Sequence, residues 1–279
     1  MDAVVRPARA SDKEPLLSFI RNVWGGHDYI PSVWDGWLAD TRNRMFVVEV
    51  GGVPVGMNRL RFQEDGSAWL EGVRVHPDYR GRGLASMLGE NSMRVARERG
   101  AGVFRLTSGS RNKAAHRQIA RIGFTEVARF SVYEPRSGMR KGTWGERVPP
   151  REAGRVVGLL RGSREYAKGR GVFWHNWSAA SLGPDMVRSL VEKGAVWRYG
   201  GAVAVMRSGG EGEGSRREVG FLGGTPDDAA RLARTLLGGS GRAERRAFVV
   251  QGSPIVHALR GSGFGRVLSN VLFERSAKD

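Results

Sequence analysis

Residues 69–85 read Trp-Leu-Glu-Gly-Val-Arg-Val-His-Pro-Asp-Tyr-Arg-Gly-Arg-Gly-Leu-Ala. The first seven alternate as in a β-strand, whose side chains point to opposite faces in turn. Gly72 interrupts this strand, and an isolated glycine in a strand often marks a bulge or a close backbone approach. From Leu84 onward an amphipathic helix is predicted. Four side chains of the strand are expected on one face: Trp69, Glu71, Val73 and Val75.

The turn between this strand and the helix is basic and rich in glycine, Arg80-Gly81-Arg82-Gly83. A strand, a glycine turn and a helix N-terminus together form an anion site, because free backbone N–H groups and the helix dipole point at the ligand. The turn lacks the Lys-Ser/Thr of a Walker A loop and the third glycine of the dinucleotide fingerprint. A phosphate-bearing ligand of another class is therefore predicted.

The same segment resembles the pyrophosphate loop of the GNAT superfamily of acyl-CoA N-acyltransferases. That loop follows a valine strand and a proline and reads Arg/Gln-x-x-Gly-x-Gly/Ala, which matches residues 75–85 here. The resemblance implies acetyl-CoA as co-substrate, with the fourth and fifth strands splayed to admit it. It implies cofactor contacts from Val73, Val75, Arg80, Gly81, Arg82, Gly83, Leu84 and Ala85.

A second motif supports the resemblance: Asn112-x-x-Ala115 followed by Gly123-Phe124. In the family this asparagine commonly contacts the pantetheine arm, so Asn112 is a candidate cofactor contact. From the residues alone Asn112 is a helix N-cap, and both roles are compatible. The predicted order of elements over about residues 3–135 is β-α-α-β-β-β-α-β-α-β-β, the order of the GNAT fold. The last two strands are expected between Phe124 and Tyr133.

The order of elements partly repeats in the second half of the chain. A hairpin around Gly200-Gly201, a strand at 218–223 and a helix start at Thr225-Pro226 are predicted there. The resemblance therefore implies a mixed α/β fold with an active N-terminal GNAT copy and a degenerate C-terminal one. The expected boundaries are a catalytic domain at 1–137, a linker at 138–150 and a GNAT-like domain at 151–279. An unrelated α+β domain is the alternative for the second half.

The second copy is expected to have lost the phosphate loop. Its corresponding segment, residues 223–228, reads Gly-Gly-Thr-Pro-Asp-Asp. These aspartates stand where a pyrophosphate would need cations. No coenzyme site is predicted in the second half.

Acylation of an amine by a thioester needs a proton acceptor, a polarised carbonyl and attack geometry. Glu71 is the candidate general base, because Leu70-Glu71-Gly72-x-x-Val75 resembles small-amine acetyltransferases in which that glutamate serves the amine. The resemblance also implies that the backbone N–H near Val73 bonds the acyl oxygen. The alternative is that Glu71 pairs with Arg59 or Arg61 across the hairpin.

The general acid and the acceptor pocket are less defined. Many family members carry a tyrosine seven residues after the asparagine, where this chain has Ile119; Tyr29 and Tyr133 are possible substitutes. The run Trp…Asp-Tyr-Ile-Pro…Trp at residues 24–37 resembles enzymes of the histidine N-acetyltransferase type. It implies that Trp24, Asp28 and Tyr29 contact the acceptor. A small helical cap with these aromatics in its core is the alternative.

Composition restricts the function classes. No cysteine is present, which excludes disulfides, thiolate metal sites and a cysteine nucleophile. The histidines lack metal-ligand spacing, so no metal site is predicted. No apolar stretch reaches membrane-spanning length and no signal peptide is recognised, so a cytoplasmic protein without a membrane partner is expected. The net charge of +17 is spread over both halves and is mostly arginine, so no nucleic-acid partner is predicted from it.

These observations predict a transferase that moves an acetyl group from acetyl-CoA directly to a primary amine of a small molecule, an amino acid being one candidate. One alternative is a protein N-terminal or lysine acetyltransferase, whose site should be an open groove. The other is a non-catalytic module that senses acetyl-CoA or binds nucleic acid. The sequence does not identify the acceptor, the general acid, the oligomeric state or any role of the second half in the acceptor site.

Overall fold

The structure, a computed structural model, describes residues 2–209, 216–239 and 243–278, apart from the side chain of Trp24. The chain forms two compact units. Unit 1 comprises Met1–Thr107, Asn112–Thr125 and Phe273–Asp279, and unit 2 comprises Ser108–Arg111 and Glu126–Leu272. The predicted catalytic domain at 1–137 and GNAT-like domain at 151–279 stay predictions. The division into compact units does not assign a function to either unit.

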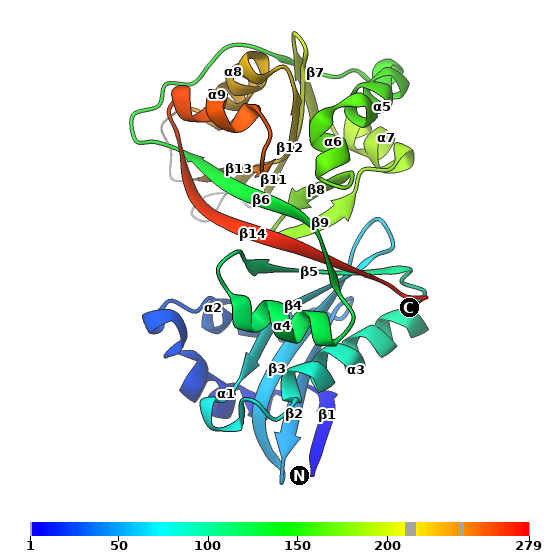
Figure 1. The fold of residues 1–279 in the computed structure, drawn as a ribbon, viewed down its shortest axis with the longest axis vertical. Helices are drawn as coiled ribbons and strands as arrows, with labels where there is room; N and C mark the ends of the chain where they lie inside the picture. The colour runs from blue at the N-terminus through cyan, green and yellow to red at the C-terminus, as the bar shows by residue number, and fades with distance from the viewer. Residues whose placement is uncertain (1, 210–215, 240–242, 279) are drawn as a thin grey trace. The chain divides into compact units, whose positions relative to one another are not determined.

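Unit 1 is built around strands that neighbour one another in the order β1-β2-β3-β4-β5. The first three pairs are antiparallel, and β4 and β5 are parallel. Figure 1 shows α1 and α2 on one side of these strands and α3 on the other. The elements are β1 (Ala3–Pro7), α1 (Lys13–Ile20), α2 (Ile30–Ala39), β2 (Arg44–Val50), β3 (Val53–Phe62), β4 (Ala68–Val75), α3 (Leu84–Glu98), β5 (Val103–Gly109) and α4 (Lys113–Arg121), with 3-10 turns at Ala10–Asp12, Val23–Gly26 and Pro77–Tyr79.

Burial of apolar faces holds these helices on the sheet of unit 1. On the α1 and α2 side, Leu16, Ile30 and Trp34 are fully buried with Met57 of β3. On the α3 side, the buried Asn58 amide of β3 donates to the Leu88 carbonyl and to the Ser92 hydroxyl, at 3.2 and 2.8 Å. The two faces of β3 therefore serve different helices.

The prediction of two closing strands between Phe124 and Tyr133 is wrong. That segment forms one continuous strand, β6 (Thr125–Pro135). Residues from the end of the chain belong to unit 1 instead: Glu274 pairs with Arg105 at 2.9 Å, and Arg275 donates to the Ile122 carbonyl at 2.7 Å. These contacts join residues 153 or more positions apart, which local patterns cannot reveal.

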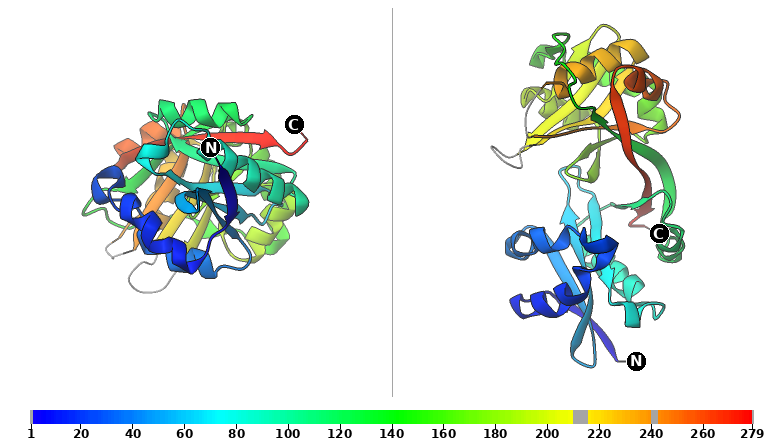
Figure 2. Two further views of the ribbon diagram at one scale, coloured as in Figure 1. Left: turned by 90° about the horizontal axis from the view of Figure 1, so that it is seen from below. Right: turned by 90° about the vertical axis from the view of Figure 1, so that its left-hand side faces the viewer.

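Unit 2 has strands in the order β14-β6-β13-β12-β11-β10-β7, with helices on both faces (Figure 1 and Figure 2). Separate apolar clusters lie under α8 with α9 and under α5 with α7. The elements are β7 (Glu146–Arg147), α5 (Ala153–Gly162), α6 (Arg164–Lys168), β8 (Val172–His175), β9 (Ser178–Ser181), α7 (Pro184–Glu192), β10 (Val196–Tyr199), β11 (Ala202–Gly209), β12 (Arg216–Gly224), α8 (Pro226–Leu237), β13 (Glu244–Val250), α9 (Ile255–Gly261) and β14 (Phe264–Ser276), with a 3-10 turn at Pro150–Glu152.

The segment expected as a linker, 138–150, is packed within unit 2. Gly142 donates its backbone N–H to the Arg234 carbonyl, and Trp144 donates to the Thr235 hydroxyl, at 3.2 and 3.0 Å. The predicted hairpin at Gly200-Gly201, the strand before Thr225 and the helix after it are all observed. No element was predicted from the sequence where α5, α6 and the β8–β9 hairpin are observed.

Candidate active site

Strand β4 carries a bulge at Gly72, as predicted. Glu71 is opposite Arg59 and Arg74 is opposite Met57, so Gly72 and Val73 together face one residue of β3. Gly72 has a φ of +70°, in the left-handed region that favours glycine. A Cβ on Gly72 would also lie 2.8 Å from the Trp37 ring. The bulge therefore depends on the missing side chain.

This bulge overturns the expectation that Trp69, Glu71, Val73 and Val75 share a face. The inserted residue reverses the alternation, so Glu71 and Arg74 now lie on the face of Arg59 and Met57, toward α1 and α2. Val75, opposite Gly56, lies on the α3 face. Glu71 therefore faces α2, and Val73 belongs to the bulge.

Beside the bulge, strands β4 and β5 part. Among the described residues their pairing is confined to Ala68 with Phe104 and Trp69 with Arg105. Both strands continue for several residues beyond these pairs. Backbone groups of β4 after Trp69 are therefore released from the β5 ladder at the point where the acyl group is expected.

The glycine turn opens directly into α3. Gly83 is its N-cap with φ +82°, and Gly81 has φ +77°. A Cβ at either glycine would meet nothing within 4 Å, so the backbone is approachable from outside. Arg80 and Arg82 are exposed, and their guanidinium groups donate to the carbonyls of Val75 and Asp78. The first N–H groups of a 15-residue helix thus start in a basic, open turn.

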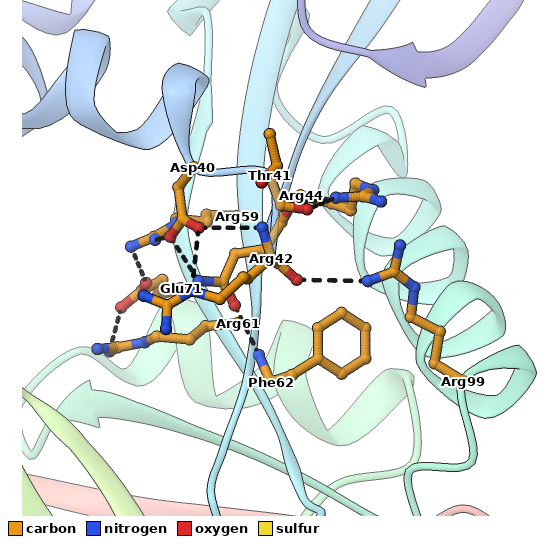
Figure 3. A network of polar contacts seen from close by, with 10 residues as sticks. Asp40, Thr41, Arg42, Arg44, Arg59, Arg61, Phe62, Glu71 and Arg99 are labelled. Atoms are coloured by element: carbon orange, nitrogen blue, oxygen red, sulfur yellow. Dashed lines mark hydrogen bonds and ion pairs between the residues drawn. The ribbon is translucent and has the colours of Figure 1, made fainter.

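Glu71 sits in an arginine network (Figure 3). Its two carboxylate oxygens accept from Arg59 Nη1 at 3.0 Å and from Arg61 Nη2 at 2.8 Å. Arg59 also pairs with Asp40 at 2.7 Å and lies 4.7 Å above the Trp37 ring. The side chains of Glu71 and Arg61 are each 13% exposed. Both arginine pairings named as the alternative for Glu71 are therefore present at once.

A second cluster continues the network toward α2. The Asp28 carboxylate is fully buried, accepts from Arg74 Nε at 2.6 Å and receives the Ile30 backbone N–H at 3.0 Å. Arg74 lies 5.6 Å from the Tyr29 ring centroid, and that ring meets Trp37 edge-on at 5.9 Å. Asp28 thus holds Arg74, which in turn supports Tyr29.

Burial shifts the pKa of two groups in this region, the Tyr29 hydroxyl and the Arg61 guanidinium. It raises the pKa of the Tyr29 hydroxyl to about 12, with further effects from Arg74 and Glu71, although 42% of the residue is exposed. Burial disfavours the charged phenolate form of Tyr29, which is why the pKa of its hydroxyl rises. Burial also lowers the pKa of the Arg61 guanidinium, and Glu71 opposes this shift. Tyr29 therefore remains a protonated hydrogen-bond donor at neutral pH.

The remaining predicted residues separate into several environments. Asn112 is the N-cap of α4, since its side chain accepts the Ala115 N–H at 3.1 Å. Ile119 is buried in the same helix. Tyr133 is 1% exposed in an apolar cluster of unit 2, and its role as a substitute acid stays a prediction. The side chain of Trp24 lies outside the described part of the structure.

The sequence assigned no role to Asp40 or Arg74, and it placed Trp37 only at the end of the aromatic run over residues 24–37. The signal for Arg74 was present, because the predicted bulge at Gly72 moves Arg74 onto the face of Glu71. No cluster of three metal-ligating side chains occurs within residues 2–209, 216–239 and 243–278. In the same ranges, no helix has the length and apolar character needed to cross a membrane.

Residues 13–124 match the Acetyltransferase (GNAT) family. This range contains the bulged strand, the basic turn and the capped α4. The part of the chain that carries this candidate site therefore belongs to the GNAT acetyltransferase family. In this GNAT domain the parted strands and the turn before α3 correspond to the predicted coenzyme site.

The chain is similar in sequence to curated N-acetyltransferases. A histidine N-acetyltransferase from Xenopus tropicalis is 29% identical over 123 residues, which are 42% of this chain and 38% of that protein. The human protein named probable N-acetyltransferase 16 is 28% identical over 219 residues, 71% of this chain and 58% of that one. The chain spans between 24% and 60% of the lengths of the curated relatives it matches.

A GCN5-related N-acetyltransferase from Sphaerobacter thermophilus is similar in fold, with a TM-score of 0.61 and 13% identity. The match covers 99% of this chain and 96% of that chain. It confirms the mixed α/β GNAT fold, and its extent is compatible with a tandem arrangement of two GNAT-like halves.

Proposed function

We propose that this protein is an N-acetyltransferase that moves an acetyl group from acetyl-CoA to a primary amine of a small molecule. The observation that carries the proposal is the junction of three features in one segment: parted strands, a bulge at Gly72 and a basic glycine turn that starts α3. GNAT membership supports the acyl donor, and the relatives named as N-acetyltransferases support the acceptor class.

The coenzyme would bind along β4 and the turn. The pyrophosphate would accept from the N–H groups of Leu84 and Ala85 beside Arg80 and Arg82, where no atom blocks Gly81 or Gly83. Val75 would pair with pantetheine, and the Val73 N–H at the bulge would donate to the acyl oxygen and polarise it. Asn112 would contact pantetheine while its side-chain oxygen keeps the cap on α4.

Acyl transfer itself needs one bond formed and one broken. The neutral amine nitrogen attacks the thioester carbon and forms the carbon–nitrogen bond, and its proton passes to the proposed base, Glu71. The carbon–sulfur bond breaks, and the sulfur leaves as a thiolate that takes up a proton from water. The Tyr29 hydroxyl, with a pKa of about 12, is better suited to donate a hydrogen bond to this thiolate than to transfer its proton. No residue is therefore required to act as a strong acid.

Glu71 is the proposed acceptor of the amine proton. Each carboxylate oxygen offers about two acceptor sites, so the two arginine bonds leave room for a third partner. The arginines also supply the structural alternative, in which Glu71 only holds β3 and β4 together. Of the two predicted acceptor contacts whose side chains the structure describes, Tyr29 is exposed, and the buried Asp28 would act through Arg74.

The direct test is release of coenzyme A by the purified chain with acetyl-CoA and a panel of amines. The panel should include free amino acids, polyamines and peptides with free N-termini. We expect release with a small amine that is absent in Gly83→Asp. Release only with peptides would support the protein acetyltransferase, and coenzyme binding without release in any mixture would contradict the enzyme proposal.

A further inference from the structure

Unit 2 contains a groove of about 660 Å³ at the point where its own parallel strands part. Pairing of β12 with β13 runs from Arg216–Glu244 to Val219–Ala247 among the described residues, whereas β12 continues to Gly224. Residues from α5, α6 and the start of α8 line the opening, including Arg155, Leu159, Arg164, Glu165, Thr225 and Pro226.

Glu165 is the unusual member of this lining. It is 5% exposed, and its carboxylate accepts from the Ser253 hydroxyl at 2.7 Å and from the Gly224 N–H at 3.3 Å. Gly224 is the last residue of β12, whereas Ser253 lies in the turn between β13 and α9, and both donors are neutral. Within the described residues, no cationic side chain pairs with Glu165.

Other buried carboxylates of this chain are paired with arginine. Asp12 pairs with Arg6, Asp28 with Arg74, and Glu218 with Arg246 and His175. Burying an ionised carboxylate without a positive partner is costly, which is why buried charges are usually paired. Glu165 departs from this rule beside an open groove and retains about two unused acceptor sites. A cationic group that enters the groove would supply the positive partner that Glu165 does not have among the described residues.

The rim of the groove carries the opposite charge. Arg155 and Arg164 are exposed, and within the described ranges their guanidinium groups have no hydrogen bond or ion pair. Leu159, which is 52% exposed, lies between them in sequence and adds apolar surface with Pro226 and Pro254. The groove thus combines a buried anion, free cations and apolar walls.

We propose that this groove of unit 2 binds a small zwitterion of the amino-acid class. Its ammonium group would pair with Glu165, its carboxylate with Arg155 or Arg164, and its aliphatic part would lie on Leu159, Pro226 and Pro254. The site is separate from the acetyl-transfer site proposed in unit 1. It gives the second half a ligand of its own, although its helix start is unsuited to a pyrophosphate.

The test uses the full chain and the twenty common amino acids as probes, first by thermal shift and then by calorimetric titration. At least one amino acid should bind to the wild type. Its decarboxylated amine should bind more weakly, and its N-acetyl derivative, which has no ammonium group, should not bind. Glu165→Gln keeps the shape of the side chain and should weaken binding by about tenfold or more. If no amino acid binds, the proposal is wrong.

Amino acids can also occupy the acceptor site proposed in unit 1, so the titrations are repeated with Glu71→Gln. Binding that survives Glu71→Gln and is lost in Glu165→Gln supports the groove. Binding that is unchanged in Glu165→Gln overturns it and leaves the proposed function standing. The double variant Arg155→Ala, Arg164→Ala removes exposed side chains only, so it should fold. The double variant should bind the amino acid more weakly than the wild type does, but should bind its decarboxylated amine equally well. An affinity for the amino acid equal to that of the wild type would contradict the assignment.

Discussion

Strands β4 and β12 each carry a bulge at a glycine, in two different chemical settings. Each has one extra residue opposite its antiparallel neighbour, at Gly72 in β4 and at Gly220 in β12. The residue before the glycine is Glu71 in unit 1 and the fully buried Val219 in unit 2. Both strands therefore have an extra residue at a glycine, but of the two only Gly72 has a positive φ, and the residue directly before the glycine is a carboxylate in unit 1 and an apolar side chain in unit 2.

The helices that follow these strands differ in the charge at their N-termini. α3 starts in a basic turn whose glycines have open space around them. α8 starts at Thr225, and Asp228 in its first turn accepts from the Gly201 N–H at 3.0 Å and from the Thr225 hydroxyl at 2.7 Å. The Gly201 hydrogen bond is the main reason that the pKa of Asp228 is lowered. An acid already occupies the region that a pyrophosphate would need.

The two halves show that the same arrangement of strands and helix can carry different chemical groups. Two halves with parted parallel strands and a following helix differ in the charge at the helix start and beside the bulge. Only the first half keeps the groups that a thioester and a pyrophosphate require.

The largest expected effect is on turnover in unit 1. Glu71→Gln preserves the size of the side chain and removes its ability to take a proton. If Glu71 is the base, turnover should fall by about 10²–10⁴-fold with little change in acetyl-CoA affinity. Steady-state rates across pH, with melting temperatures alongside, measure this. A variant that melts earlier but keeps wild-type turnover per folded molecule would show that Glu71 is only a partner of Arg59 and Arg61.

The two bulges should differ in their tolerance of a side chain. A Cβ at Gly220 would lie 1.8 Å from the Trp174 backbone carbonyl oxygen, whereas a Cβ at Gly72 would meet the Trp37 ring at 2.8 Å. Gly220→Ala should lower the free energy of unfolding by about 3 kcal/mol or more, and Gly72→Ala by about 2–3 kcal/mol.

Gly66→Ala is the matched control for this pair. Gly66 has φ +76° and nothing within 4 Å of its added Cβ, so it reports backbone strain alone, about 1–2 kcal/mol. Denaturant unfolding of the three variants gives the comparison. Equal losses at Gly66 and Gly72 would mean that the Trp37 contact does not restrict the bulge.

Coenzyme affinity should respond to charge at the start of α3. Gly83→Asp places a carboxylate beside the proposed pyrophosphate and should weaken acetyl-CoA binding by at least about tenfold. Gly83→Asn is the control, because asparagine has nearly the same shape, tolerates the left-handed conformation and carries no charge. Calorimetric titration of both variants separates charge from conformation. Equal affinities in the two variants would remove electrostatics from the account.

The smallest expected effect is on the stability of unit 2. Because the folded state lowers the pKa of Asp228, its contribution is present above the ordinary value of 3.8 and is lost as pH falls through the folded value. Asp228→Asn should therefore cost at most about 1 kcal/mol at neutral pH, reduced further by solvent exposure, and nothing in strong acid. Melting curves from neutral to acidic pH should converge. A difference that persists at the lowest pH would have a cause other than charge.

Local patterns predicted much of this molecule. The Gly51-Gly52 hairpin, the basic turn and the helix after Thr225 each depend on residues close in sequence, and each is observed. The facing of Val73 and Val75 relative to Glu71 was mispredicted, because the bulge, although expected, was not carried through to the alternation after it. The return of Glu274 to Arg105 was not predicted, because that pairing joins residues 169 positions apart. Cofactor and acceptor roles stay predictions.

The number of acetyl-CoA molecules bound by one chain tests the contrast between the two halves most directly. Calorimetric titration of the full chain should give one site per chain, and that site should weaken in Gly83→Asp and stay unchanged in Asp228→Asn. Two sites per chain, or one site with wild-type affinity in Gly83→Asp, would contradict the assignment of the coenzyme to the turn before α3.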